Sequence, residues 1–116
     1  MKIESLKNKK DFDRVFSGKK SFGNRHLTLL YCKNGLDHNR IGIIISKKIS
    51  KKAVVRNHLR RQLREIFRSN QHRILSGYDF IIIPKIQCID ISFETLSRSF
   101  GHLFYKTGLQ ERDKAL

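Results

Sequence analysis

The sequence of 116 residues is poor in acids, proline and cysteine, and it contains no tryptophan and no long hydrophobic run. Its apolar stretches, such as residues 43–45 and 80–83, are only a few residues long, whereas a membrane-spanning helix needs about 20 residues. The first ten residues contain no apolar core of the kind found in secretory signal peptides. We therefore expect a cytoplasmic protein without a membrane segment.

The two cysteines and the few acids also exclude several kinds of site. Cys32 and Cys88 are far apart and form no C-x-x-C pair, so neither a disulfide framework nor a zinc site is predicted. The ten acids are scattered, and the five histidines show no metal-ligand spacing with cysteine or aspartate. A protein-only nuclease would need clustered carboxylates to hold metal ions. The sequence does not favour that class of enzyme.

Basic residues dominate what is present. There are 25 Lys and Arg against 10 Asp and Glu, which gives a net charge of +15. A compact chain with this charge repels itself, and a polyanionic partner relieves the repulsion. Residues 47–73 contain ten basic residues and a single acid, Glu65. Nucleic acid is the leading candidate partner, ahead of an anionic membrane surface, because the chain has no separate amphipathic anchor.

The hydrophobic pattern predicts a single α+β domain over residues 1–116, a two-layer sandwich with a central mixed sheet. The predicted order is α-β-β(-β)-α-β-α: a helix at 9–17, a short extra strand near 20–23, strands at 25–33 and 40–46, a helix at 53–69, a strand at 77–84 and a helix at 93–107. We expect the strands at 25–33 and 40–46 to pair as an antiparallel hairpin. The strand at 77–84 contains a continuous apolar run at 80–83, which predicts burial on both faces or at least a central position.

The helix at 53–69 has two distinct faces. At about 100° per residue, one arc is apolar and an adjacent arc is almost purely arginine. This arginine arc comprises Arg56, Arg60, Arg61, Arg64 and Arg68, with Asn57 inside it. Guanidinium groups bind phosphate with two parallel hydrogen bonds and stay charged when partly desolvated. The arc therefore predicts an RNA- or DNA-binding surface rather than a merely solvated face.

Four segments of the chain together resemble one known family. Ser46-Lys47-Lys48 is followed by Val55-Arg56-Asn57-His58-Leu59-Arg60-Arg61-Gln62-Leu63-Arg64, which matches an S-K-K strand end and an R-N-x-x-K/R-R-x-x-R helix. Phe12 and Phe16 match a D-F-x-x-V-F helix, Asn24-Arg25 an N-R before a strand, and residues 78–83 a late strand. In these features the chain resembles the bacterial ribonuclease P protein component. Ser50-Lys51 stands where that family often has a glycine before the helix.

The resemblance implies a function and a set of contacts. Members of the family are the protein subunit of an RNA-based endonuclease that removes the 5′ leader of precursor tRNA. Catalysis belongs to the RNA subunit and its bound Mg²⁺, so no catalytic residue is expected in the protein. The implied fold includes a left-handed β-α-β crossover. The residues implied to bind the RNA subunit are Arg56, Asn57, Arg60, Arg61, Arg64 and Arg68, and those implied to form the leader cleft are Phe12, Phe16, Arg25, Lys47 and Lys48.

Several alternatives stay open from the residues themselves. A structural RNA-binding protein, such as a ribosomal protein, shares the size and charge. A DNA-binding regulator ranks low, because a strand rather than a partner helix precedes the arginine-rich helix. Phe12 and Phe16 suit a hydrophobic core as well as a stacking surface for bases. Asn57 suits either an RNA contact or a role in fixing the start of its helix.

Overall fold

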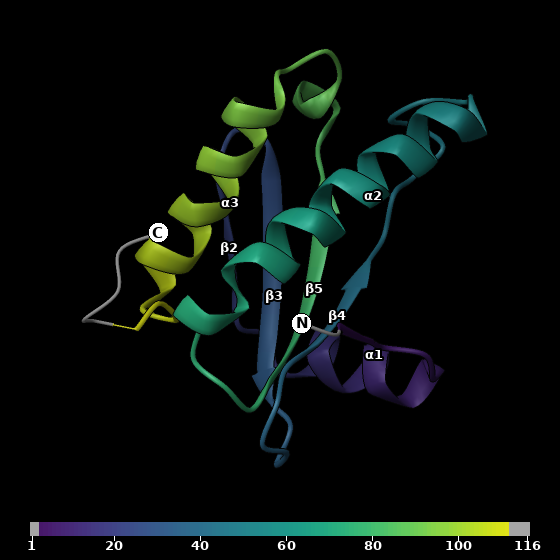
Figure 1. Ribbon diagram of the computed structural model, residues 1–116. Helices are drawn as coiled ribbons and strands as arrows, with labels where there is room; N and C mark the ends of the chain where they lie inside the picture. The colour runs from purple at the N-terminus through teal and green to yellow at the C-terminus, as the bar shows by residue number, and fades with distance from the viewer. Residues whose placement is uncertain (1–2, 112–116) are drawn as a thin grey trace.

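The computed structural model describes residues 3–111, and it has the predicted α+β architecture (Figure 1). The elements are β1 (Glu4–Ser5), α1 (Lys9–Ser17), β2 (Ser21–Gly23), β3 (Leu27–Lys33), β4 (Arg40–Ile43), α2 (Ala53–Asn70), β5 (Tyr78–Pro84) and α3 (Phe93–Thr107), with 3₁₀ turns at Gln71–Arg73 and Ile86–Cys88. The order predicted from the sequence is confirmed. The two-residue strand β1 was not predicted, because so short a segment has no hydrophobic period.

The strands form one mixed sheet in the order β1-β4-β5-β3-β2. The predicted hairpin between the strands at 25–33 and 40–46 is wrong, since β5 lies between β3 and β4. It pairs antiparallel with β3 and parallel with β4. Phe80, Ile81 and Ile82 of β5 are all completely buried. A strand that is apolar on both faces gains most from the central position, and the loop after β3 does not force its neighbours together.

The connection from β4 through α2 to β5 is a left-handed crossover. In Figure 1 both strands run upward, α2 lies in front of the sheet, and β5 lies to the left of β4. Parallel crossovers are right-handed in about 98% of cases. The rare handedness that the family resemblance implied is therefore present.

The larger core lies between the sheet and the pair of helices α2 and α3. Four completely buried phenylalanines dominate it: Phe67, Phe80, Phe100 and Phe104. The ring of Phe80 packs edge to face against Phe104, with 5.1 Å between ring centres, and against Phe67, with 6.1 Å between ring centres. Such contacts add to the burial of apolar area. This core fixes the apolar side of α2, so the other sides of the helix are free to face a partner.

A smaller cluster lies on the opposite face of the sheet, under α1. It is built on Leu6, Val15 and Ile81, with Phe12 packed against it. Helix α1 covers only part of this face: it packs over β3 and β5 near Cys32 and Ile81. The sheet therefore carries two helices on one face and a partly open surface beside α1 on the other.

Candidate RNA interface

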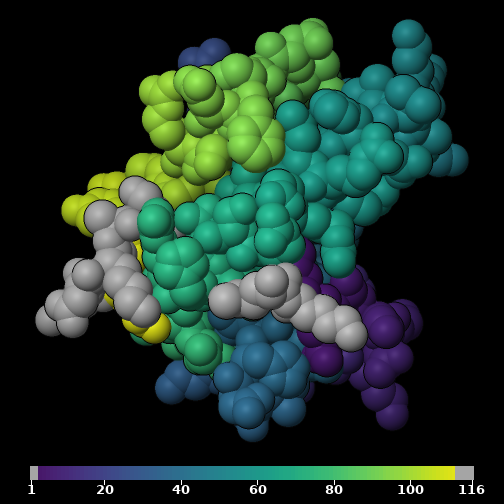
Figure 2. Space-filling model, in the orientation of Figure 1, coloured from purple at the N-terminus to yellow at the C-terminus, as the bar shows by residue number. Residues whose placement is uncertain are grey.

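The arginine arc lies on the sides of α2 that point away from the core. Leu59, Leu63, Ile66 and Phe67 are buried against the sheet, as the helical pattern predicted. Arg64 donates a hydrogen bond of 2.8 Å to the Ser5 hydroxyl, so this part of the arc lies beside β1. Figure 2 shows the side chains of α2 as a continuous surface between α3 and α1.

Local contacts orient the arginines without neutralising most of them. Arg56 donates to the Ser50 carbonyl at 2.7 Å, and Arg60 donates to the Asn57 side-chain oxygen at 3.0 Å. Both acceptors are uncharged, so the positive charges remain available. Asn57 is exposed and makes its contact with Arg60. It holds a guanidinium in place rather than capping the helix, whose N-cap residue is Lys52.

Arg68 is the exception within the arc, because it pairs with Glu65. The guanidinium Nε lies 2.9 Å from one carboxylate oxygen and Nη2 lies 2.5 Å from the other. The hydrogen bond from Arg68 lowers the pKa of Glu65. Glu65 is the sole acid in residues 47–73, and it holds one end of the arc in an internal ion pair.

Removing that acid is expected to strengthen RNA binding. Glu65→Gln frees Arg68 and lowers the negative charge beside the arc, and exposed pairs of this kind are worth about 0.2–1 kcal/mol. We expect affinity for a folded RNA to rise by up to about fivefold, measured by filter binding at fixed salt. Glu94→Gln on α3 makes the same charge change away from the arc and serves as control. Equal gains from both variants would mean that only net charge matters.

The loop between β4 and α2 presents lysines on short serine-supported turns. Lys47 and Lys48 are exposed. The backbone N–H of Lys48 donates to the Ser46 hydroxyl at 3.0 Å, and that of Lys52 to the Ser50 hydroxyl at 3.2 Å. Among residues 3–111, the non-glycine residues with positive φ are Lys19 and Asp90. Ser50-Lys51 therefore replaces the family's frequent glycine without backbone strain.

Helix α1 presents its two phenylalanines differently. Phe12 is half-buried and lies directly over Gly42 of β4, where a Cβ atom would come within 2.6 Å of its ring. Only glycine allows this close approach. Phe16 is 43% exposed. Phe12 thus packs α1 onto the sheet while Phe16 offers an open aromatic face beside it.

Arg25 lies apart from this pair. It precedes β3, whereas α1 packs near Cys32 at the other end of that strand. Arg25 lines a shallow pocket of about 260 Å³ together with Arg98 and His102 of α3. Neighbouring Asn24 accepts hydrogen bonds from the backbone N–H groups of His26 and Leu27 and donates to the Ser99 carbonyl. The structure therefore does not bring Arg25 together with Phe12 and Phe16.

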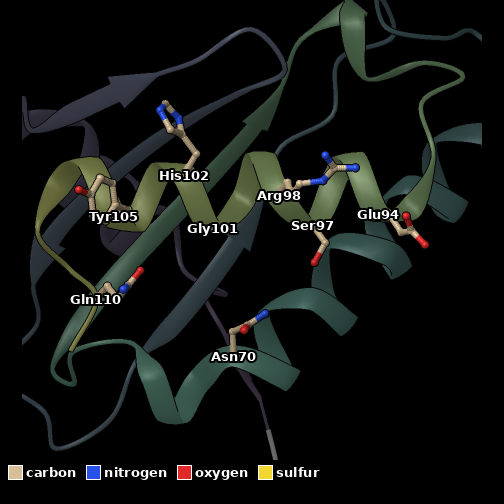
Figure 3. Close-up of a pocket in the computed structure, with 8 residues that line it drawn as sticks. All are labelled: Asn70, Glu94, Ser97, Arg98, Gly101, His102, Tyr105 and Gln110. Atoms are coloured by element: carbon tan, nitrogen blue, oxygen red, sulfur yellow. The ribbon is translucent and has the colours of Figure 1, made fainter. Parts of the chain in front are cut away.

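A larger hollow lies elsewhere, between the end of α2 and α3 (Figure 3). Its volume is about 970 Å³, and its lining residues are Asn70, Glu94, Ser97, Arg98, Gly101, His102, Tyr105 and Gln110. In the close-up, Arg98 and His102 point away from Asn70 across the groove. The groove thus has an acid at one end and no convergent cations, unlike the arginine arc.

A buried ion cluster under α1 was missed by the sequence analysis. Asp79 of β5 is completely buried. It accepts two hydrogen bonds from Arg40, at 2.7 and 2.8 Å, one from Asn34 at 2.9 Å, and one from Arg14 of α1. Burial raises the pKa of this carboxyl, but the hydrogen bonds and the charge of Arg40 outweigh it, so the pKa of Asp79 is lowered. A lone acid in an apolar strand was the available signal, since a buried charge needs partners.

The two cysteines differ in environment, and their reactivity is expected to differ. Cys88 is buried and donates to the His26 carbonyl, and burial raises the pKa of its thiol to about 11. Because the thiolate is the nucleophile, Cys88 should resist iodoacetamide at pH 8 while half-buried Cys32 reacts first. Mass spectrometry of the labelled native protein checks this order. Denatured protein, in which both cysteines should react alike, is the control.

Two absences complete the description of residues 3–111. No three His, Cys, Asp or Glu side chains gather where they could hold a metal ion. No helix in this part of the chain is long and apolar enough to cross a membrane. The candidate site itself consists of the arginines and lysines described above and the exposed ring of Phe16.

An arginine-lined helix on a mixed sheet is typical of a basic, nucleic-acid-binding α+β protein. Comparison with known proteins narrows this class. The sequence profile of the Ribonuclease P family matches residues 1–108. The ribonuclease P protein component of Caldanaerobacter subterraneus is 39% identical over 110 residues, which cover 95% of this chain and 94% of that protein. The chain belongs to the ribonuclease P protein component family.

Solved structures of ribonuclease P proteins have the same fold as this chain. The ribonuclease P protein of Staphylococcus aureus superposes with a TM-score of 0.84 at 30% identity, covering 93% of this chain and 98% of that one. The ribonuclease P protein of Thermotoga maritima superposes with a TM-score of 0.81 at 34% identity, covering 89% of this chain and 96% of that one. The chain is thus an accessory protein subunit of the ribonuclease P endoribonuclease, which processes the 5′ end of tRNA. Its family implies a partner RNA subunit, and a ribosomal protein is not favoured.

Proposed function

We propose that this protein binds the catalytic RNA through the arginine arc and the 5′ leader of precursor tRNA through the cleft between α1 and the open sheet face. The observation that carries the proposal is the placement of the two surfaces. The arc lies along α2 on one side of the sheet, and α1 lies on the other. One small protein can therefore contact two RNA segments at once.

The chemistry of each surface suits a different RNA. Folded RNA is recognised through its shape, phosphates and 2′-hydroxyl groups, for which a row of guanidinium groups is suited. Single strands bind through stacking on aromatic rings within a positive groove, largely without regard to sequence. The partly exposed ring of Phe16 beside Phe12 provides such a stacking surface.

Strand β4 connects the two surfaces. Gly42 lies under Phe12, and the chain continues from there to Lys47 and Lys48 and then into α2. A leader that leaves the aromatic pair along β4 meets these lysines next. Arg25 lies at the same end of the sheet as the end of β4, because Leu27 at the start of β3 pairs with Pro84, and Ile43 at the end of β4 pairs with Ile82. It lines a pocket with residues of α3, however, and so lies beside α3. We assign Arg25 a contact with a phosphate outside the cleft.

Mg²⁺ belongs to the RNA in this proposal. Residues 3–111 offer no cluster of metal ligands, so the fit of the protein to a metal of its own is poor. The ion, held by the RNA, supplies the activation of water for cleavage of the phosphodiester. The positive charges of the protein reduce repulsion between the precursor tRNA and the catalytic RNA. The protein therefore has its largest effect when Mg²⁺ is scarce, in the cytoplasm where tRNA matures.

The test is 5′-leader cleavage of a precursor tRNA by the cognate catalytic RNA at low Mg²⁺, with and without the protein. We expect marked stimulation by the protein and no cleavage by the protein alone. Stimulation should fade as Mg²⁺ is raised, because the ion then screens the phosphates itself. Tight RNA binding without stimulation would instead indicate a structural RNA-binding protein.

A further inference from the structure

The buried ion cluster ties α1 to the sheet on the side opposite the aromatic pair. Arg14 is two residues from Phe12 and two from Phe16, which places it about 160° around the helix from each. Val15, completely buried over Ile81, lies between these two sides. Helix α1 thus rests on Val15, with a charged contact on one edge and the two rings on the other.

Few other contacts hold α1. The helix has nine residues, and its N-cap Asn8 makes no side-chain capping bond. Helices this short are unstable in isolation and depend on tertiary contacts. Its apolar contacts are a small cluster of three buried residues, Leu6, Val15 and Ile81, and the half-buried ring of Phe12 on Gly42. A small rotation about the helix axis would keep Val15 near the sheet but would shift the Phe12 ring on Gly42 and swing Phe16 toward the sheet or away from it.

We propose that Arg14 is a positioning residue, whose ion pair with Asp79 fixes the rotation of α1 and thereby the opening of the leader cleft. The target of the contact is rigid. Asp79 lies on the central strand and is held independently by both donors of Arg40 and by Asn34. Asp11, one helical turn before Arg14, lies 3.4 Å from the Arg40 guanidinium and 3.8 Å from Arg14, which adds a second link on the same edge.

Arg14 can be removed without leaving a buried charge unpaired. Its own side chain is 45% exposed, and Asp79 keeps its contacts with Arg40 and Asn34. Arg14→Gln should therefore fold, whereas changes at Asp79 disturb the core. Lys10→Gln makes the same charge change on the same helix at an exposed residue, and Arg14→Lys keeps the charge but loses the planar fork.

This inference rests on the proposed function, so the experiment tests the leader cleft and the role of Arg14 separately. The assembled complex of protein and cognate RNA is titrated with precursor tRNA and with mature tRNA, and the ratio of the two affinities reports the leader contact. We expect Arg14→Gln to lower this ratio about fivefold, with affinity for mature tRNA and for the catalytic RNA unchanged. Lys10→Gln should leave the ratio unchanged, and Arg14→Lys should restore part of it. Phe16→Ala, which removes the exposed ring, should lower it at least fivefold.

A second measurement on the free protein does not depend on RNA. Hydrogen exchange of the α1 amides should speed up in Arg14→Gln and not in Lys10→Gln, with the β5 amides unchanged. If Phe16→Ala lowers the affinity ratio and Arg14→Gln does not, the positioning role is wrong and the leader cleft stands. If neither lowers it, the cleft is wrong as well. A wild-type complex that does not prefer precursor tRNA would overturn both.

Discussion

Replacing Asp79 with alanine is expected to lower the free energy of unfolding by about 3–5 kcal/mol. The carboxylate is completely buried and accepts hydrogen bonds from Arg14, Arg40 and Asn34. Its removal leaves the Arg40 guanidinium, itself largely buried, without its main counter-charge. Urea denaturation of the free protein measures the loss. Asp13→Ala removes an exposed acid from α1 that pairs with the exposed Lys9, and a comparable loss there would contradict the role of burial.

The same carboxyl predicts how stability depends on pH. Because the pKa of Asp79 is lower in the folded protein than in the unfolded chain, ionisation stabilises the folded state. This contribution is complete above the unfolded pKa, near 4, and is lost as the pH falls through the folded pKa. Wild-type protein should therefore lose stability below about pH 4, while Asp79→Asn should be less stable at neutral pH and less sensitive to acid. Parallel acid profiles for the two proteins would contradict this.

Local sequence signals account for the helices. The limits of α1 and α3 agree with their predicted ranges, and α2 is one residue longer. Ser92 caps α3 by accepting from the backbone N–H of Thr95, and Gly108 ends it in the left-handed conformation. Such signals lie within a few residues of the element that they define. A short-range pattern is therefore enough to place a helix, although it cannot say which face of the sheet the helix covers.

Pairing of the strands is a long-range property, and there the sequence analysis was wrong. The hairpin between β3 and β4 was predicted because the two strands are adjacent in sequence. The competing partner, β5, comes after the 18-residue helix α2, and its buried apolar residues Phe80, Ile81 and Ile82 gain more from the centre of the sheet. No local pattern reports such a competition between segments. The crossover handedness likewise came from the family resemblance and not from periodicity.

In the candidate site, too, local features could be predicted from the sequence and long-range contacts could not. The arginine arc follows from helical periodicity alone, and the structure places its residues on the solvent sides of α2. Helical spacing could not show that Phe12 lies on Gly42, because that contact joins two elements 30 residues apart. It also could not separate Arg25 from the aromatic pair. The ion cluster of Asp79 joins residues from α1, β4 and β5, which only the folded chain brings together.

Substitution of Arg60 and Arg61 by alanine is expected to have the largest effect on RNA binding. Both lie in the arginine arc, and neither forms an ion pair with an acid among residues 3–111: Arg60 contacts the uncharged Asn57, and Arg61 is exposed. Hydrogen bonds to charged groups are worth about 1.5 kcal/mol or more each. Loss of two such contacts should weaken binding of the catalytic RNA by at least about 100-fold.

Salt dependence separates direct contact from net charge in this variant. Each phosphate contact contributes about one unit to the slope of the logarithm of affinity against the logarithm of salt concentration. Arg60→Ala/Arg61→Ala should therefore flatten the slope by about two units. The matched control, Arg98→Ala/Lys106→Ala, removes the same charge from exposed positions on α3 and should leave the slope nearly unchanged. If a defined interface lies on α2, only the α2 variant should change the slope. Equal slopes for the two double variants would show instead that the RNA responds to the charge of the whole protein.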